Sequence, residues 1–197
     1  MRAVGIDLAG SGKRDTGYCF LEGRSAKASI LHSDDGILAS LMEDKPDIVA
    51  IDAPLSLPKG RKSIDERDSH HFRRCDLELR KLGIRFFPIT LGPMRMLTKR
   101  GMALKRKIAH ALPEARVIEV YPGATYDLLG TGRKDKKAIR SLFRKRGIAL
   151  TGRALSQDEL DGVCCALTGK MCLEGSAGPI GDESEGTIII PIVKNVR

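Results

Sequence analysis

The sequence lacks tryptophan and is poor in other aromatic residues, with five Phe and three Tyr among 197 residues. This composition does not indicate a surface for stacking on bases. The five cysteines have no regular spacing, which favours reduced thiols over a disulfide framework. His70, His71 and Cys75 lack a second Cys or His group at ligand spacing, so a zinc site is not indicated. These absences exclude the disulfide-rich and zinc-bound small-domain classes.

Long apolar stretches are also missing, since no run approaches the roughly 20 residues of a membrane-spanning helix. The first residues enter a predicted strand directly, so we expect no signal peptide. Together with reduced thiols, this predicts a cytoplasmic protein without a membrane partner. A content of 42% hydrophobic and 30% charged residues is typical of a folded domain. We expect residues 1–197 to form one domain, which is long enough to bury a proper core.

Positive charge is abundant, with a formal net charge of +9. Basic residues gather at 59–62, 95–107 and 133–146. This distribution favours a polyanionic partner, and DNA or RNA bound through its phosphates would be held in a salt-sensitive way. The alternative is a basic surface that serves solubility alone.

Hydrophobic periodicity predicts an α/β fold. Alternation of Val4, Ile6 and Leu8 with smaller residues indicates a half-buried first strand. Asp34 or Asp35 is expected to cap a helix that Pro46 ends. Ser156 and Glu159 form a capping-box sequence that opens a late helix. Further strands are predicted at 17–21, 28–31, 47–52, 116–121 and 187–192. Pro122 and Gly123 end the fourth of these, and the fifth is expected to be an edge strand or a hairpin arm. Further helices are predicted at 64–82, 94–112 and 134–146, with a link at 148–150 and turns after Gly175.

The order of these elements predicts a mixed sheet flanked by helices. The first three strands are separated by short turns, which suits an antiparallel meander. The apolar run at 47–52 is typical of a buried strand in the parallel part of a sheet. Most of the predicted helical residues after this strand fall at about 55–113, and we expect this segment to form a helical insertion.

Three predicted strands carry a carboxylate at or near their C-terminal ends: Asp7, Asp52 and Glu119. Parallel strands bring these ends to one edge of a sheet, where binding sites form. Asp158 and Asp161 share one stripe of the late helix, at the border of its apolar face. Acidic groups this close repel unless a cation intervenes. Oxygen ligands suit Mg²⁺ or Mn²⁺, and a pair of such ions can support phosphodiester hydrolysis.

Each carboxylate also has a structural explanation. Asp7 and Asp52 could be turn formers or helix caps. Glu119 could form an ion pair with one of the many Arg and Lys residues. Asp158 could simply be an acidic residue favoured at a helix N-terminus.

Several short motifs are spread over nearly the whole chain: residues 5–11 with 16–17, 51–55, 74–76 with 79–80 and 83–84, 97–98 with 100–101, 119–122, and 158 with 161–169. Together they resemble the DUF429 family of predicted nucleases with an RNase H-like fold, and the late helix is similar to the final acidic helix of RuvC and YqgF-like resolvases. The resemblance implies an RNase H-like mixed sheet, antiparallel in its first three strands and then parallel. It also implies that Asp7, Asp52, Glu119 and Asp161 bind metal.

The sequence therefore predicts a metal-dependent nuclease that uses two Mg²⁺ or Mn²⁺ ions. Asp7, Asp52, Glu119 and Asp161 are the expected catalytic residues and metal ligands, with Asp158 a further ligand. Two alternatives remain open: a non-catalytic nucleic-acid-binding module, and an actin-like phosphotransfer enzyme that uses the 10–13 turn. The turn does not complete a Walker phosphate-binding motif. That motif needs Gly at the position that Asp7 occupies and Ser or Thr at the position that Arg14 occupies. The predicted phosphate-binding residues are Lys13, Arg74, Lys99, Arg100 and Lys105.

Overall fold

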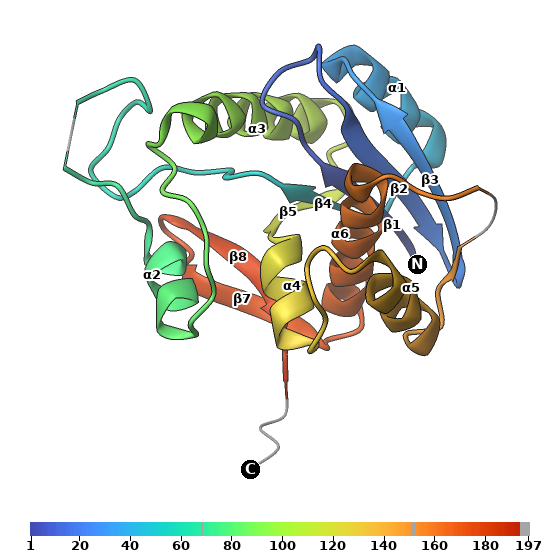
Figure 1. The fold of residues 1–197 in the computed structure, drawn as a ribbon. Coiled ribbons are helices and arrows are strands. Elements are labelled where there is room, and N and C mark those ends of the chain that lie inside the picture. Colours follow the sequence, from blue (N-terminus) through green and yellow to red (C-terminus); the bar gives the residue numbers. More distant parts are fainter. Residues whose placement is uncertain (68, 151–152, 194–197) are drawn as a thin grey trace.

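The computed structural model describes residues 1–67, 69–150 and 153–193. Within these residues the chain builds one eight-stranded sheet of order β6-β3-β2-β1-β4-β5-β8-β7 (Figure 1). The first strand is therefore internal, with β2, β3 and β6 on one side and β4, β5, β8 and β7 on the other. The strands are β1 (Arg2–Asp7), β2 (Thr16–Glu22), β3 (Ser25–Leu31), β4 (Ile48–Asp52), β5 (Arg116–Val120), β6 (Ala149–Leu150), β7 (Ala177–Asp182) and β8 (Gly186–Pro191).

The strand directions confirm the predicted mixed sheet, with an antiparallel first part followed by parallel strands. β1, β2 and β3 form an antiparallel meander. β4 runs parallel to β1, β5 parallel to β4, and β8 parallel to β5. The C-terminal ends of β1, β4 and β5 therefore lie along one edge of the sheet, which is where the acidic residues are.

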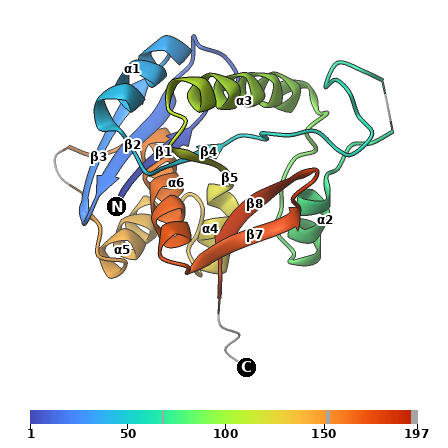
Figure 2. The same ribbon diagram turned by 180° about the vertical axis from the view of Figure 1, so that it is seen from behind.

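Helices cover both faces of the sheet. α4, α5 and α6 contribute to the core on one face, whereas α1 and α3 pack on the other, seen from behind in Figure 2. α2 packs on the β7–β8 hairpin. No helix among the described residues is both long and apolar enough to cross a membrane. The helices are α1 (Asp34–Asp44), α2 (Arg74–Lys81), α3 (Gly92–Ala111), α4 (Pro122–Leu128), α5 (Lys136–Lys145) and α6 (Gln157–Leu173).

The alternation of side chains along β1 explains why both faces of this strand are buried in apolar cores. Ala3 joins the core under α6, while Val4 and Ile6 join the core under α1 and α3. β4 repeats this pattern, with Ala50 on the α6 face and Ile51 on the other. A strand buried on both faces needs a nearly continuous apolar sequence, as these two strands have.

Glycines let α6 lie unusually close to the first two strands. A Cβ on Gly5 would come within 2.1 Å of the Gly162 carbonyl oxygen, and one on Gly17 within 1.8 Å of the Asp158 carbonyl oxygen. Only residues without side chains permit this approach. The contact places the first turns of α6 directly over the ends of β1 and β2.

The predicted helix at 64–82 is wrong over its first half. Only α2 is helical there, and residue 68 lies outside the described residues. The guanidinium of Arg61 is buried and donates to the carbonyl oxygens of Ser63, Glu66 and His70. These carbonyl oxygens accept hydrogen bonds from a side chain, so they need no partner in the backbone of a helix.

Smaller differences occur at the ends of elements. Ser33, rather than Asp34 or Asp35, caps α1 by accepting from the Gly36 amide. Pro122 ends β5 as predicted and also begins α4, a position where its missing N–H costs nothing. Residues 149–150, predicted as a link, pair with β3 as the short strand β6.

The β7–β8 hairpin was only half predicted. The segment at 187–192 is the hairpin arm β8, but it is not an edge strand, because β7 lies outside it. β7 was predicted as turns, since Gly178, Pro179 and Gly181 disfavour strands. Its edge position tolerates them, because one side of an edge strand needs no hydrogen-bond donors.

Candidate functional site

Asp7 and Asp52 are paired neighbours at the ends of two parallel strands. Their Cα atoms are partners in the β1–β4 register, so their backbones lie about 5 Å apart. Neither carboxylate accepts a hydrogen bond or forms an ion pair with any described residue. Two acidic groups therefore lie side by side with no cationic partner in the described part of the chain.

Burial and mutual repulsion shift the protonation of this pair. Burial, followed by the charges of Asp161 and Asp158, raises the pKa of Asp7 from its ordinary 3.8 to about 8. Burial also raises the pKa of Asp52 well above its ordinary value, and the neighbouring carboxylates raise it further. A site that destabilises its own negative charge in this way has the electrostatics of a cation-binding centre.

Asp161 is held in place by neutral donors. The Tyr126 hydroxyl donates to its Oδ1 at 2.8 Å, and the Gln157 amide donates to both carboxylate oxygens at 3.0 and 3.1 Å. Burial raises the pKa of Asp161, and these hydrogen bonds oppose that shift. The donors orient the carboxylate without neutralising its charge.

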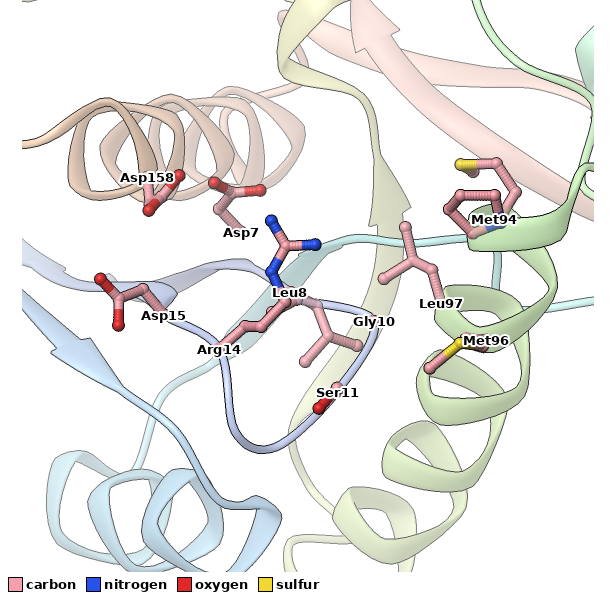
Figure 3. Close-up of a pocket in the computed structure, with 12 residues that line it drawn as sticks. Asp7, Leu8, Gly10, Ser11, Arg14, Asp15, Met94, Met96, Leu97 and Asp158 are labelled. Carbon is pink, nitrogen blue, oxygen red and sulfur yellow. The ribbon is translucent and has the colours of Figure 1, made fainter.

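A cavity of about 510 Å³ opens beside this acidic group. Asp7 and Asp158 lie on one side of it, and Met94 and Leu97 of α3 lie on the other (Figure 3). The loop between β1 and β2 forms its floor and supplies Arg14, whose side chain extends into the cavity. The cavity thus combines acidic groups, a basic side chain and an apolar wall.

Glu119 is close to the pair but is already engaged. Arg73 Nη1 and Nη2 donate to its two carboxylate oxygens at 2.7 Å each, and the Leu55 amide donates to Oε2 at 2.8 Å. The Arg73 guanidinium also donates to Asp76, at 2.9 and 3.2 Å. The ion-pair explanation considered for Glu119 is therefore the arrangement observed.

The segment at 74–76 contributes structure to this arrangement. Asp76 accepts a hydrogen bond from the backbone amide of Arg73, the N-cap residue of α2. Cys75 is buried against β7, where a Cβ on Gly181 would come within 2.7 Å of it. Arg74 points outward and pairs with Glu78 one turn later. These residues dock α2 and support the buried ion pairs of Arg73.

Among the described residues, no three His, Cys, Asp or Glu side chains are grouped closely enough to hold a metal ion as they stand. The carboxylates nevertheless interact, since the charge of Asp161 raises the pKa of Asp7 and the charges of Asp7 and Asp161 raise the pKa of Asp52. Their oxygens are hard ligands of the kind that Mg²⁺ and Mn²⁺ prefer. The donor set fits a hard divalent cation, and side-chain rotation would have to bring the oxygens together.

The predicted phosphate-binding residues lie in different surroundings. Arg100 is mostly buried and donates to Asp34 and to the carbonyl oxygens of Ala9 and His32, so it ties the β1–β2 loop to α1. Lys99 is exposed and pairs with Asp65. Lys13 is exposed in the loop itself. Lys105 lies elsewhere on α3, at a separate cavity of about 280 Å³, and Arg74 lies on α2.

Sequence reasoning missed four residues of this site. Arg73 and Tyr126 carry no local signal, since their partners are 46 and 35 positions away. Gln157 precedes Asp161 by one helical turn, a spacing that could have suggested the contact. Arg14 was noted only as the residue that breaks the Walker pattern.

Comparisons with known proteins give one family and several similar structures. A family model described as "Protein of unknown function (DUF429)" matches residues 5–186. No curated protein matches the sequence. Similar solved structures include RuvC of Thermus thermophilus, with 14% identity, 89% of this chain and 97% of that chain covered, and a TM-score of 0.49. RuvC of T. thermophilus in complex with a Holliday junction substrate has 13% identity, coverage of 85% and 91%, and a TM-score of 0.46.

Proposed function

The chain belongs to the DUF429 family, and from the arrangement of its carboxylates we propose that it is a divalent-metal-dependent nuclease. The observation that carries this proposal is the pairing of Asp7 with Asp52 at adjacent strand ends without a cationic partner among the described residues. Like charges cost free energy when they are buried together, unless a bound cation offsets them. A site that serves only stability would have paired each carboxylate with a cationic side chain, as Glu119 is paired with Arg73.

Asp7, Asp52 and Asp161 would hold the cation, with Asp158 at the rim of the cavity. Bound Mg²⁺ or Mn²⁺, alone or as two ions, would supply charge stabilisation and a more acidic water for phosphodiester hydrolysis. Hydrolysis forms one P–O bond from the water oxygen and breaks the P–O bond to the leaving sugar oxygen, which takes up a proton.

The protein's own residues would prepare the site in two ways. Tyr126 and Gln157 keep the Asp161 carboxylate aimed at the strand ends. Glu119, proposed from the sequence as a ligand, has both oxygens engaged, so it would act as a positioning residue that links β5 to α2 through Arg73.

Basic residues around the cavity support nucleic acid as the substrate. Arg14 lines the cavity that contains Asp7, and Lys13 is its exposed neighbour. Lys99 lies further along α3, and its charge would extend the contact with a phosphate backbone, whereas Lys105 lies at a separate cavity. The net charge of +9 favours such a polyanion.

The test is cleavage of labelled single-stranded, duplex and branched DNA and RNA, with Mg²⁺, with Mn²⁺ and with EDTA. We expect cleavage with metal, none with EDTA, and a loss of at least about a hundredfold in Asp7→Asn, because general electrostatic stabilisation at a reacting centre is of this size. Asp35→Asn is the matched control, since Asp35 is an exposed carboxylate on α1, and it should cleave normally.

Other outcomes would favour the alternatives. Binding without cleavage under every metal condition would reject the nuclease and favour a nucleic-acid-binding module. ATP turnover, or a rise in Tm with nucleotide, would favour phosphotransfer at the β1–β2 loop. Equal cleavage by wild type and Asp7→Asn would show that the activity arises elsewhere.

A further inference from the structure

The aromatic residues that are scarce in the sequence are concentrated at one place in the structure. Of five Phe and three Tyr in the chain, four lie around a single cleft of about 610 Å³, which we call the aromatic cleft. It lies beside α2 and the segment that follows it. Its aromatic side chains are Phe72, Phe86, Phe87 and Tyr121.

Three of these four rings are already in contact with a neighbour. Phe72 and Phe86 pack edge to face, with centroids 6.1 Å apart. The guanidinium carbon of Arg80 lies 4.2 Å from the Phe72 centroid, and that of Arg133 lies 5.4 Å from the Tyr121 centroid. Phe87 differs, because it is 68% exposed and has no ring partner among the described residues. The cleft therefore presents one open aromatic ring.

The wall of the cleft formed by Tyr121 and Arg133 is held in place by hydrogen bonds. Arg133 pairs with Asp127 and also donates to the Arg85 carbonyl oxygen and the Tyr121 hydroxyl, at 3.0 and 2.8 Å. The Tyr121 hydroxyl in turn donates to the same carbonyl oxygen at 2.7 Å. A Cβ on Gly123 would come within 2.7 Å of the Tyr121 ring. A wall ordered in advance loses little entropy when a ligand binds.

The charged side chains that line the cleft are all basic. Arg80, Arg85 and Arg133 line it, and no Asp or Glu does. Arg80 and Arg85 are exposed and form no ion pair with a described residue. Exposed guanidinium groups beside an open ring suit a ligand that is both flat and anionic.

The aromatic cleft is continuous with the acidic site. A cavity of about 160 Å³ is lined by Asp52 and also by Phe86, Phe87 and Tyr121. The same three aromatic residues line the aromatic cleft. A ligand seated on Phe87 would thus be a neighbour of whatever is bound at Asp52.

We propose that the aromatic cleft holds one unpaired nucleotide of the substrate, with its base against Phe87 and its phosphate at Arg80 or Arg85. This inference rests on the proposed function and specifies its substrate class: nucleic acid with at least one unpaired base next to the bond that is cleaved. A regular duplex keeps its bases stacked inside and offers no ring to Phe87, so it would use only phosphate contacts.

The experiment measures binding in EDTA, where no cleavage is needed. A short single-stranded oligonucleotide that contains the fluorescent base 2-aminopurine, and the duplex of the same sequence, are titrated with wild type, Phe87→Ala, Phe87→Tyr and Met42→Ala. Met42 is a matched control, since it is 50% exposed but lies on α1. Exposure of Phe87 means that its removal should leave the fold intact, and a thermal melt checks this.

We expect wild type to bind the single strand more tightly than the duplex and to change the 2-aminopurine fluorescence. Phe87→Ala should weaken single-strand binding about tenfold, a typical loss for one stacked base, and leave duplex binding unchanged. Phe87→Tyr should restore binding, and Met42→Ala should match wild type. Equal single-strand affinity in wild type and Phe87→Ala, or no preference for the single strand in wild type, would overturn the proposal.

The two proposals fail separately. If nothing is cleaved but Phe87→Ala loses single-strand binding, the nuclease is rejected and the nucleotide site stands. If cleavage depends on Asp7 but Phe87→Ala binds like wild type, the nuclease stands and the nucleotide site is rejected.

Discussion

Arg73 and Glu119 form a buried two-pronged ion pair, with both guanidinium nitrogens 2.7 Å from the two carboxylate oxygens and both side chains at most 6% exposed. On the same edge of the sheet, at the ends of β1 and β4, Asp7 and Asp52 have no such partner among the described residues. This edge of the sheet therefore contains one carboxylate whose charge is neutralised, Glu119, and two whose charges are not, Asp7 and Asp52. This contrast distinguishes the residues that support the site from those that would bind a cation.

Removal of Arg73 should destabilise the protein strongly. Arg73→Ala leaves Glu119 and Asp76 buried without their partner, which typically costs about 3–5 kcal/mol. Urea denaturation should show this loss in the free energy of unfolding. Arg74→Ala is the control, because Arg74 is exposed and its pair with Glu78 is worth less than about 1 kcal/mol. Equal losses in the two variants would contradict this account of the ion pair.

Gly5→Ala should displace α6 from the sheet. The new Cβ would fall 2.1 Å from the Gly162 carbonyl oxygen, so the helix must move. Overpacking of this kind costs about 1–3 kcal/mol or more, and displacement of Asp161 should also reduce cleavage. Gly10→Ala is the control, because its Cβ would meet nothing closer than 3.6 Å. A normal Tm for Gly5→Ala would show that the close approach of α6 is not required.

The raised pKa of Asp7 predicts a dependence of stability on pH in metal-free buffer. The native state holds a proton on Asp7 up to about pH 8, whereas the unfolded state releases it near 3.8. Stability from this group is therefore complete below about pH 4 and is lost as the pH rises to about 8. Asp7→Asn does not titrate, so its Tm relative to wild type should be higher at pH 9 than at pH 5.

Asp35→Asn checks the specificity of this effect, since it should show the same difference in Tm from wild type at both pH values. A pH-independent difference between Asp7→Asn and wild type would mean that Asp7 titrates normally.

A divalent cation should stabilise the protein through the same carboxylates. At a concentration about a hundredfold above its Kd, Mn²⁺ would add about 2.7 kcal/mol, or a rise in Tm of about 5–10 °C for a chain of this size. Asp7→Asn should lose most of this rise in a thermal-shift assay, while Asp35→Asn should keep it. An equal rise in all three proteins would place the cation at another site.

The acidic edge could be predicted from the sequence because it depends on local patterns. Alternation in 3–8 and the apolar run at 47–52 locate two strands, and the known edge of a parallel sheet brings Asp7 and Asp52 together. The capping box at Ser156 and Glu159 likewise sets the start of α6, and thereby the face on which Asp161 lies. Each of these signals spans only a few residues.

The partners of the site could not be predicted in the same way. Arg73 lies in a segment predicted to be helical, and nothing near it indicates that it reaches Glu119 on β5. Tyr126 lies on a helix that begins at a proline, where the strand was expected only to end. The aromatic cleft gathers Phe72, Phe87 and Tyr121 from segments separated by up to 49 positions (121 − 72 by residue number).

The sequence by itself determined the mixed sheet, the positions of the strand-end carboxylates and the basic character of the chain, because hydrophobic periodicity and the residue at the end of each strand are local properties. Only the tertiary structure decided which of those carboxylates is neutralised and where the few aromatic residues meet. Both outcomes depend on contacts between distant segments, and the free energy of a buried charge or ring is set by whichever side chains the fold brings beside it.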